Sequence, residues 1–174
     1  LAFSKRRVTV STSGLIPEID RLGADFDGQI QLAISLHAST DEQRSQIMPI
    51  NKKYPLTDLV AALRRYPMPK RRSITVEYTL IRGFNDSLAD AQRLHQLLRG
   101  LRYKVNLIPW NAIADTPLMA PSWDEVERFQ RSLQERSVIT LVRRRKGDDI
   151  AAACGQLALS APTKVRRMLP KLGV

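Results

Sequence analysis

The sequence of 174 residues has little of several residue types, and each shortage excludes a class of protein. A single cysteine, Cys154, excludes an internal disulfide framework and a metal site built from several cysteines. No run of about 18 apolar residues is present, so we expect no membrane-spanning helix. The opening stretch, LAFSKRRVTV, lacks the apolar core of a signal peptide, so we expect no secretory signal. Aromatic residues make up only 6%, which argues against a stacking platform for single-stranded nucleic acid.

Positive charge, in contrast, is in excess. The chain carries 28 Lys and Arg against 17 Asp and Glu, a formal net charge of +11. These residues gather in runs, at Arg6-Arg7, Lys52-Lys53, Arg64-Arg65, Lys70-Arg71-Arg72 and Arg143-Arg144-Arg145-Lys146, and in an acid-free tail at 160–174. A field of this sign attracts polyanions, of which nucleic acid is the commonest in a cell. The pattern favours a phosphate backbone as partner, with a basic surface that only aids solubility as the alternative.

Strand and helix patterns alternate along the chain. Runs rich in β-branched and apolar residues predict strands at 7–12, 29–36, 73–81, 103–108 and 138–143. Apolar residues at helical spacing predict helices at 15–22, 41–47, 57–66, 87–98 and 122–136, the first of them stopping at Gly23. Strands joined by helices indicate parallel pairing. The sequence therefore predicts one α/β unit, either a doubly wound sheet or a barrel with fewer than the eight strands of a closed one.

Polar residues follow four of the predicted strands. They lie at 11–13, 35–37, 83–86 and 106–111, and Gly14 beside the first group would let the backbone approach a ligand closely. Ligands of parallel α/β proteins bind beyond the carboxyl ends of the strands. Turn formation or helix capping explains any one group alone. Four groups at the same edge predict a small-molecule pocket.

Single residues are less informative. Taken alone, His37 is more typical of a core or loop histidine than of a ligand or base, and His95, in mid-helix, is expected to face solvent without a role. Trp110 and Trp123 are interpreted as packing anchors. Cys154 stands among small residues after a basic run, which fits a reactive thiol and a small buried hydrophobe equally well.

Six segments together resemble a known family. They are VTVSTSG at 8–14, AISLHA at 33–38, RSQIMPINKKYPL at 44–56, GFNDS at 83–87, KVNLIPWN at 104–111 and GDDIAAACGQL at 147–157. In this order they are similar to the carboxyl-terminal two-thirds of the radical S-adenosylmethionine methyltransferases that methylate adenine in large-subunit ribosomal RNA and in transfer RNA. The resemblance implies an α/β fold, a partial (β/α) radical-SAM-type barrel of parallel strands that lacks its amino-terminal strands. Residues 1–146 would form the barrel part, and 147–174 a carboxyl-terminal segment with the catalytic cysteine and a basic tail.

The resemblance also implies cofactors and site residues. The cofactors are S-adenosylmethionine and a four-iron four-sulfur cluster. Residues that match family contacts to S-adenosylmethionine are Ser11 (with Ser13 close enough to compete for the assignment), Ser35, Leu36, His37 and Asn111. Cys154 matches the cysteine that becomes an S-methylcysteine intermediate. The implied product carries a methyl group on carbon 2 of adenine, with carbon 8 as the alternative. The implied partners are ribosomal RNA, transfer RNA and an electron donor for the cluster, for a cytoplasmic monomer that binds no membrane.

One departure from the family pattern is large. The C-x-x-x-C-x-x-C motif that holds the cluster is absent, because Cys154 is the only cysteine, and no metal ligand is assigned in this chain. We therefore expect these 174 residues to be part of a longer enzyme and to be inactive alone. A non-catalytic RNA-binding remnant of the same fold is the main alternative. An unrelated α/β binding domain with a basic face is a third hypothesis.

Overall fold

The computed structural model describes residues 4–111 and 116–143. Within these ranges the strands are β1 (Thr9–Thr12), β2 (Gln31–Ser35), β3 (Ile74–Leu80), β4 (Tyr103–Pro109) and β5 (Ile139–Val142). The helices are α1 (Ile16–Phe26), α2 (Asp41–Ile47), α3 (Leu56–Arg65), α4 (Leu88–Leu97) and α5 (Trp123–Gln134), with short 3-10 helices at Lys5–Arg7 and Pro49–Lys52. None of the helices in the described ranges is both long and apolar enough to cross a membrane.

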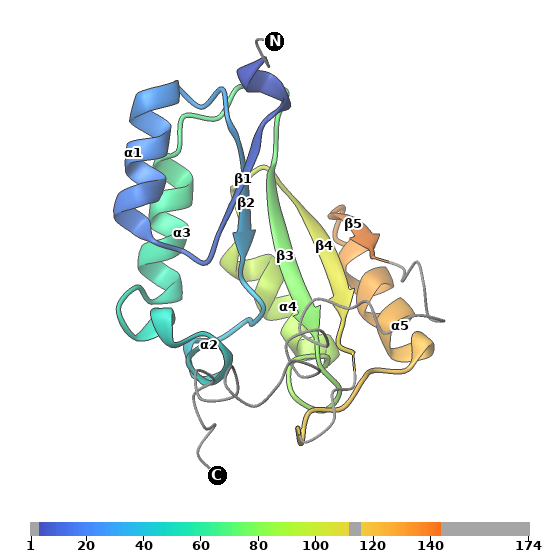
Figure 1. Ribbon diagram of the computed structural model, residues 1–174. Coiled ribbons are helices and arrows are strands. Elements are labelled where there is room, and N and C mark those ends of the chain that lie inside the picture. The colour runs from blue at the N-terminus through green and yellow to red at the C-terminus, as the bar shows by residue number, and fades with distance from the viewer. Residues whose placement is uncertain (1–3, 112–115, 144–174) are drawn as a thin grey trace, which may run out of the picture.

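The order of the strands decides between the two predicted architectures. The sheet runs β1-β2-β3-β4-β5, and every neighbouring pair is parallel. Each connection therefore steps in the same direction, and right-handed crossovers then place all the connecting helices on one face of the sheet. A doubly wound sheet would reverse its direction part-way. Figure 1 shows this arrangement, with α1 beside α3 and α4 behind the sheet. The α/β, partial-barrel prediction is confirmed.

The two faces of the sheet differ in character. In β3, Ile74, Val76, Tyr78 and Leu80 are buried, while the residues between them are half-buried, because successive side chains of a strand point to opposite faces. The buried set packs with apolar residues of α1, α3, α4 and α5 in one core, where the rings of Tyr78 and Phe129 stack with centroids 5.3 Å apart.

The opposite face, which we call the inner face, is polar at its centre. Across it, Ser35 of β2 pairs in register with Glu77 of β3, and Glu77 pairs with Asn106 of β4. One row nearer the strand starts, Thr75 pairs with Lys104. A hydroxyl, a carboxylate and an amide thus stand side by side on neighbouring strands, about 4.8 Å apart from strand to strand.

The first helix differs from the prediction. It does not stop at Gly23 but continues to Phe26 and ends at Asp27, whose φ of 45° leaves the helical region. Gly23 is buried where α1 meets the end of α3, and a Cβ there would lie 2.8 Å from Cδ of Pro67. The glycine permits close packing inside the helix rather than ending it.

Two further predictions about single residues are wrong. Trp123 is not a packing anchor, since it is 54% exposed at the start of α5. His95 does not simply face solvent: it is half-buried, and its Nδ1 lies 3.3 Å from the hydroxyl of Tyr103.

Candidate functional site at the carboxyl ends of the strands

The predicted polar edge exists as one structural unit. The carboxyl ends of β1 to β4 lie together because the strands are parallel and adjacent. We call this edge, with the segments that follow each strand, the carboxyl-terminal rim. In Figure 1 it is the lower end of the sheet, with α2 below β2.

A buried arginine joins the first two strand ends. Arg44 of α2 is 0% exposed, and its guanidinium donates four hydrogen bonds. Its acceptors are the carbonyl of Ser13 at 2.7 Å, the carbonyl of Ser35 at 3.2 Å, the carbonyl of Leu36 at 3.1 Å and Oδ1 of Asn51 at 3.0 Å. Burial lowers the pKa of Arg44, while the neighbouring charge of Asp41 raises it. The outward-pointing carbonyls of two strands therefore compensate a buried cation.

Gly14 makes room for this arginine. Its φ is 106°, which a residue with a side chain rarely adopts, and a Cβ there would lie 3.2 Å from NH2 of Arg44 and 3.2 Å from Cδ2 of Leu59. The close approach predicted for Gly14 is thus an approach to Arg44, not to a ligand.

His37 is held in a fixed orientation and a fixed protonation state. Its φ is 60°, its Nδ1 accepts a hydrogen bond from the backbone N–H of Thr79 at 3.1 Å, and its own N–H donates to the carbonyl of Glu77. Burial, and then the charge of Arg44, lower the pKa of His37 from 6.5 to about 4. The imidazole is therefore neutral at pH 7. Because Nδ1 accepts, the proton sits on Nε2, which is a donor at the rim.

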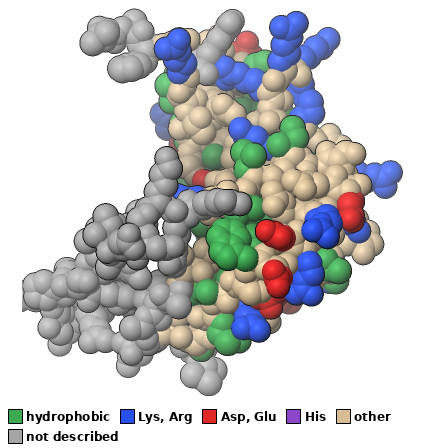
Figure 2. Space-filling view, turned by 90° about the vertical axis from the view of Figure 1, so that its right-hand side faces the viewer, with side chains coloured by type: hydrophobic (Ala, Val, Ile, Leu, Met, Phe, Trp, Pro, Cys, Tyr) green, Lys and Arg blue, Asp and Glu red, His purple; other side chains and the backbone are tan. Residues whose placement is uncertain are grey.

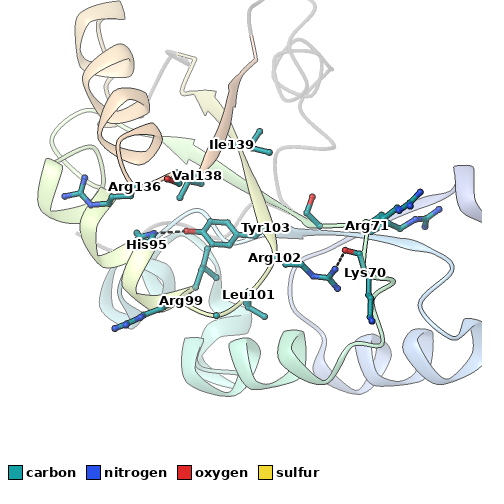
Figure 3. Close-up of a pocket in the computed structure, with 15 residues that line it drawn as sticks. Lys70, Arg71, His95, Arg99, Leu101, Arg102, Tyr103, Arg136, Val138 and Ile139 are labelled. Carbon is teal, nitrogen blue, oxygen red and sulfur yellow. Dashed lines mark hydrogen bonds between the residues drawn. The ribbon is translucent and has the colours of Figure 1, made fainter.

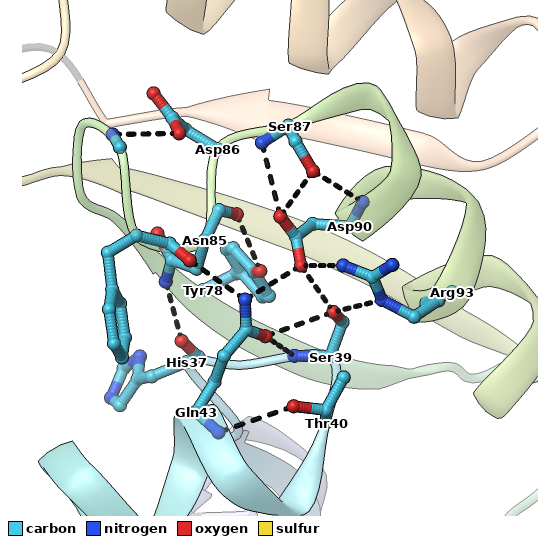
Figure 4. Close-up of polar contacts among 12 residues, drawn as sticks. His37, Ser39, Thr40, Gln43, Tyr78, Asn85, Asp86, Ser87, Asp90 and Arg93 are labelled. Atoms are coloured by element: carbon cyan, nitrogen blue, oxygen red, sulfur yellow. Dashed lines mark hydrogen bonds and ion pairs between the residues drawn. The ribbon is translucent and has the colours of Figure 1, made fainter.

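Asn85, in the predicted third polar group, is used entirely within the protein. Its side chain is fully buried, with Oδ1 accepting from the N–H of Ile81 at 2.8 Å. Its Nδ2 donates to the carbonyls of His37 and Thr79, both at 2.7 Å. Asn85 thus locks the turn after β3 onto the segment after β2 (Figure 4). Its role is structural, which leaves fewer groups of this turn for a ligand.

A buried carboxylate supports the same region from below. Asp90 of α4 accepts from Ser39 Oγ at 2.7 Å, Gln43 Nε2 at 2.9 Å and Arg93 NH2 at 2.6 Å, and it completes a capping box with Ser87. Burial alone raises the pKa of Asp90, but the hydrogen bonds from Ser87, Ser39, Gln43 and Arg93 outweigh it and hold that pKa below its ordinary value. Figure 4 shows how this network ties α2 to α4. The loop that carries His37 is therefore anchored on two helices.

Glu77 is a candidate that the sequence analysis missed. It lies on the inner face of β3, half-buried, and its Oε2 accepts a hydrogen bond from Ser35 Oγ at 3.3 Å. The signal was present, since Glu77 is the one charged residue in the apolar alternation ITVEYTL. A carboxylate on the open face of a strand next to Ser35 is available for a cationic or hydroxyl-bearing ligand.

The other predicted site residues are placed as follows. Ser11 is exposed on β1, in register with Ala33 of the inner face. Leu36 is 0% exposed, and its N–H and carbonyl both bond within the protein, to Glu77 and Arg44, so its contribution is to place its neighbours. Asn111 is half-buried just beyond β4.

Two predictions lie partly or wholly beyond what the structure describes. Cys154 and the boundary at residue 147 fall outside the described residues. Within the described ranges, no group of three or more His, Cys, Asp or Glu is placed to hold a metal ion.

Comparison with solved structures defines the class of protein. A radical SAM methyltransferase from Sphaerobacter thermophilus matches with a TM-score of 0.81 and 49% identity, over 88% of this chain and 45% of that one. A domain of pyruvate-formate lyase-activating enzyme from Bacteroides vulgatus shares the fold, with a TM-score of 0.60 and 14% identity over 78% of this chain and 80% of that domain. The chain has the fold of a radical SAM barrel.

Comparison with curated proteins gives the particular family. A dual-specificity RNA methyltransferase RlmN from Sorangium cellulosum is 61% identical over 168 residues, which are 96% of this chain and 43% of that protein. The RlmN of Geotalea uraniireducens is 51% identical over 155 residues, 89% of this chain and 45% of that protein. No family model matches the chain. The chain is thus homologous to a segment of the RlmN family of radical SAM methyltransferases, and it spans a little less than half the length of these relatives.

Proposed function

We propose that this chain is part of a radical SAM methyltransferase that methylates carbon 2 of an adenine in large-subunit ribosomal RNA and in transfer RNA. The observation that carries the proposal is the 61% identity over 168 residues with a protein named as a dual-specificity RNA methyltransferase. The choice of carbon 2 over carbon 8 rests on the sequence resemblance. A cytoplasmic location, a monomeric state and an electron-donor partner belong to the same proposal.

The carboxyl-terminal rim fits S-adenosylmethionine. This cofactor carries an ammonium and a sulfonium cation, ribose hydroxyls and an adenine ring. Glu77 offers a carboxylate for a cation or for hydroxyls, and Ser35 beside it offers a hydroxyl. The neutral His37 offers a donor at Nε2, and Asn111 an amide. We place the cofactor across the ends of β2, β3 and β4, with Ser11 of β1 at its edge.

A buried donor without a partner supports this placement. Nε1 of Trp110 is buried, and no acceptor lies within hydrogen-bonding reach among the described residues. Trp110 directly follows β4, and its backbone N–H bonds to the carbonyl of Leu80 at the end of β3. Buried donors are nearly always satisfied in folded proteins, so a group bound at the rim would complete the hydrogen bonding here.

The residues of this chain do not fit the four-iron four-sulfur cluster. Such clusters are held by cysteine thiolates, and the chain has one cysteine, Cys154. The ligands must come from a part of the protein that is not in this sequence.

Cys154 is the proposed methyl acceptor. Carbon 2 of adenine is not nucleophilic, so it cannot take a methyl group directly from a sulfonium. In the step that we assign to Cys154, its thiol loses a proton and the resulting thiolate attacks the methyl carbon of S-adenosylmethionine. One S–C bond forms on Cys154 as the S–C bond of the sulfonium breaks, which leaves S-methylcysteine and S-adenosylhomocysteine. The assignment rests on the GDDIAAACGQL match.

A methyl-transfer assay tests the proposal. The protein that carries this sequence, at its native length and with its cluster reconstituted, is incubated with methyl-labelled S-adenosylmethionine and an adenine-containing ribosomal RNA fragment. We expect labelled RNA from the wild type and from the control Arg21→Gln, which alters an exposed residue of α1, and none from Cys154→Ala. Mass analysis of the RNA digest identifies the methylated carbon. RNA binding without transfer by the wild type would favour the non-catalytic remnant. Full transfer by Cys154→Ala would overturn the role of Cys154.

A further inference from the structure

A second cavity lies at the opposite end of the sheet from the carboxyl-terminal rim. Its volume is about 520 Å³, and it is formed where β3, β4 and β5 begin. Six of its lining residues are cations: Lys70, Arg71, Arg72, Arg99, Arg102 and Arg136. None of its lining residues is Asp or Glu. We call it the basic pocket, and Figure 3 shows these residues around it.

Three separate turns build this concentration of charge. Lys70 to Arg72 precede β3, Arg99 and Arg102 flank the turn before β4, and Arg136 precedes β5. Figure 2 shows the same tendency on the molecular surface, where Lys and Arg predominate at the upper end, at which the strands begin in Figure 1. Like charges gathered from segments distant in sequence repel one another unless an anion is present.

Half of the six cations have a structural task. Arg72 donates to the carbonyl of Gln29 at 2.7 Å, and Arg136 donates to the carbonyl of Ser132 at 2.6 Å. Arg102 donates to the carbonyls of Met68, at 3.1 Å, and Lys70. These bonds hold the turns together, and they explain why arginine is found at these positions.

The other three cations are not explained by the fold. The side chains of Lys70, Arg71 and Arg99 are exposed, and none forms an ion pair with an acid in the part of the chain that the structure describes. Arg65, in contrast, is an exposed arginine whose charge is matched by Asp20 at 2.9 Å. Lys70, Arg71 and Arg99 therefore remain available to an external anion.

The floor of the basic pocket is polar but not a stacking platform. His95 and Tyr103 lie there, 3.3 Å apart between Nδ1 and the hydroxyl, and burial raises the pKa of Tyr103 to about 12, so its hydroxyl stays neutral. Tyr103 is the one aromatic ring of Phe, Tyr or Trp in the lining. A pocket of this kind suits the phosphate backbone of a nucleic acid more than its bases.

We propose that the basic pocket is a docking site for the phosphate backbone of the RNA substrate, separate from the rim where the chemistry occurs. The identification of the anion as RNA rests on the proposed function. The seven residues of β3 separate the two ends by roughly 20 Å, so the partner must be a folded RNA that extends along the barrel while its adenine reaches the rim. Contacts of this type orient the RNA without reading its sequence.

The test compares two triple variants of the native-length protein. Lys70→Gln, Arg71→Gln and Arg99→Gln together remove the three unmatched charges of the basic pocket. Arg21→Gln, Lys53→Gln and Arg128→Gln together remove the same charge from residues that do not line it. Binding of a folded ribosomal RNA fragment is measured by fluorescence anisotropy between 50 and 200 mM salt, alongside methyl transfer. We expect the pocket variant to bind about tenfold more weakly, with a salt dependence reduced by up to about 2 phosphate contacts, and with a raised KM but an unchanged kcat.

Each outcome decides the proposal. Equal weakening in both triple variants, or none in the pocket variant, overturns it. A lowered kcat with unchanged RNA binding also overturns it, because docking would then not be the function of these residues. A folded-state check by thermal unfolding is expected to give the same midpoint for both variants, since all six residues are exposed. If the wild type binds RNA through the pocket but transfers no methyl group, the docking site stands and the proposed methyltransferase function fails.

Discussion

NH2 of Arg44 donates a hydrogen bond of 2.7 Å to the carbonyl oxygen of Ser13, and this bond joins α2 to the end of β1. The same guanidinium reaches the carbonyls of Ser35 and Leu36 at the end of β2. Parallel strands leave carbonyls at their carboxyl ends without a partner, and here one buried side chain satisfies them on two strands. Arg44 thus sets the relative position of the segments that line the carboxyl-terminal rim.

Replacing this arginine is expected to cost much stability. Arg44→Met would leave three carbonyls and Oδ1 of Asn51 without their donor in a buried site, so we expect the free energy of unfolding to fall by roughly 3 kcal/mol or more. Urea denaturation measures the change. The exposed Arg128→Met serves as the control, with a loss within about 0.5 kcal/mol. A similar small loss for Arg44→Met would show that these bonds do not hold the rim.

The neutral state of His37 makes stability depend on pH. Its pKa is lowered to about 4 in the folded state from 6.5, so between these values the unfolded chain binds the additional proton. The free energy of unfolding should therefore fall as the pH drops from about 6.5 towards 4, by about 3 kcal/mol from this group. His37→Asn tolerates the φ of 60° and keeps an acceptor, and it should flatten the slope in this window.

NMR provides an independent check on the same residue. Nitrogen-detected spectra of the imidazole should show the proton on Nε2 and no titration of His37 above pH 5. A titration midpoint between pH 6 and 7 would contradict the buried, neutral assignment.

The buried carboxylate of Asp90 is expected to require its charge. Asp90→Asn replaces an acceptor of several donors by an amide that brings donors of its own, so hydrogen bonds from Ser39, Gln43 or Arg93 are lost. We expect a loss of about 2–3 kcal/mol in the free energy of unfolding. Asp58→Asn, at an exposed position of α3, is the matched control and should change it by less than about 0.5 kcal/mol. Equal effects of the two substitutions would refute a supporting role for this network.

Glu77 is expected to contribute to cofactor affinity rather than to folding. Glu77→Gln keeps the shape but removes the charge at the inner face, so titration calorimetry with S-adenosylmethionine should show a Kd raised about tenfold or more. The unfolding midpoint should hardly change, because Glu77 is half-buried with one hydrogen bond from Ser35. Glu127→Gln on the exposed side of α5 is the control and should leave the Kd unaltered. An unaltered Kd for Glu77→Gln would place the cofactor elsewhere.

The sequence predicted the elements well because local signals were strong. Thr40 accepts from the backbone N–H of Gln43 at the start of α2, and Ser87 and Asp90 form a complete capping box on α4, in line with the helix starts predicted there. Gly23 misled the prediction, because a glycine that permits close packing has the same letter as one that ends a helix.

The site was predicted only in outline, for a physical reason. The polar groups at the strand ends followed from parallel topology, but what each group does depends on contacts between distant segments. The buried Arg44 reads in sequence as one more basic residue, and Asn85 as a turn residue, whereas both act across more than one strand end. The basic pocket similarly combines cations from three turns, which only the fold brings together.

The most direct test of the central claim is a mass analysis of the peptide that contains Cys154, taken from the protein purified at its native length from its natural source. The account predicts a methyl group on the sulfur of Cys154 in a substantial fraction of molecules, and the loss of this mass when the protein turns over with RNA. An unmodified thiol at Cys154 in protein that methylates RNA at the normal rate would contradict the account.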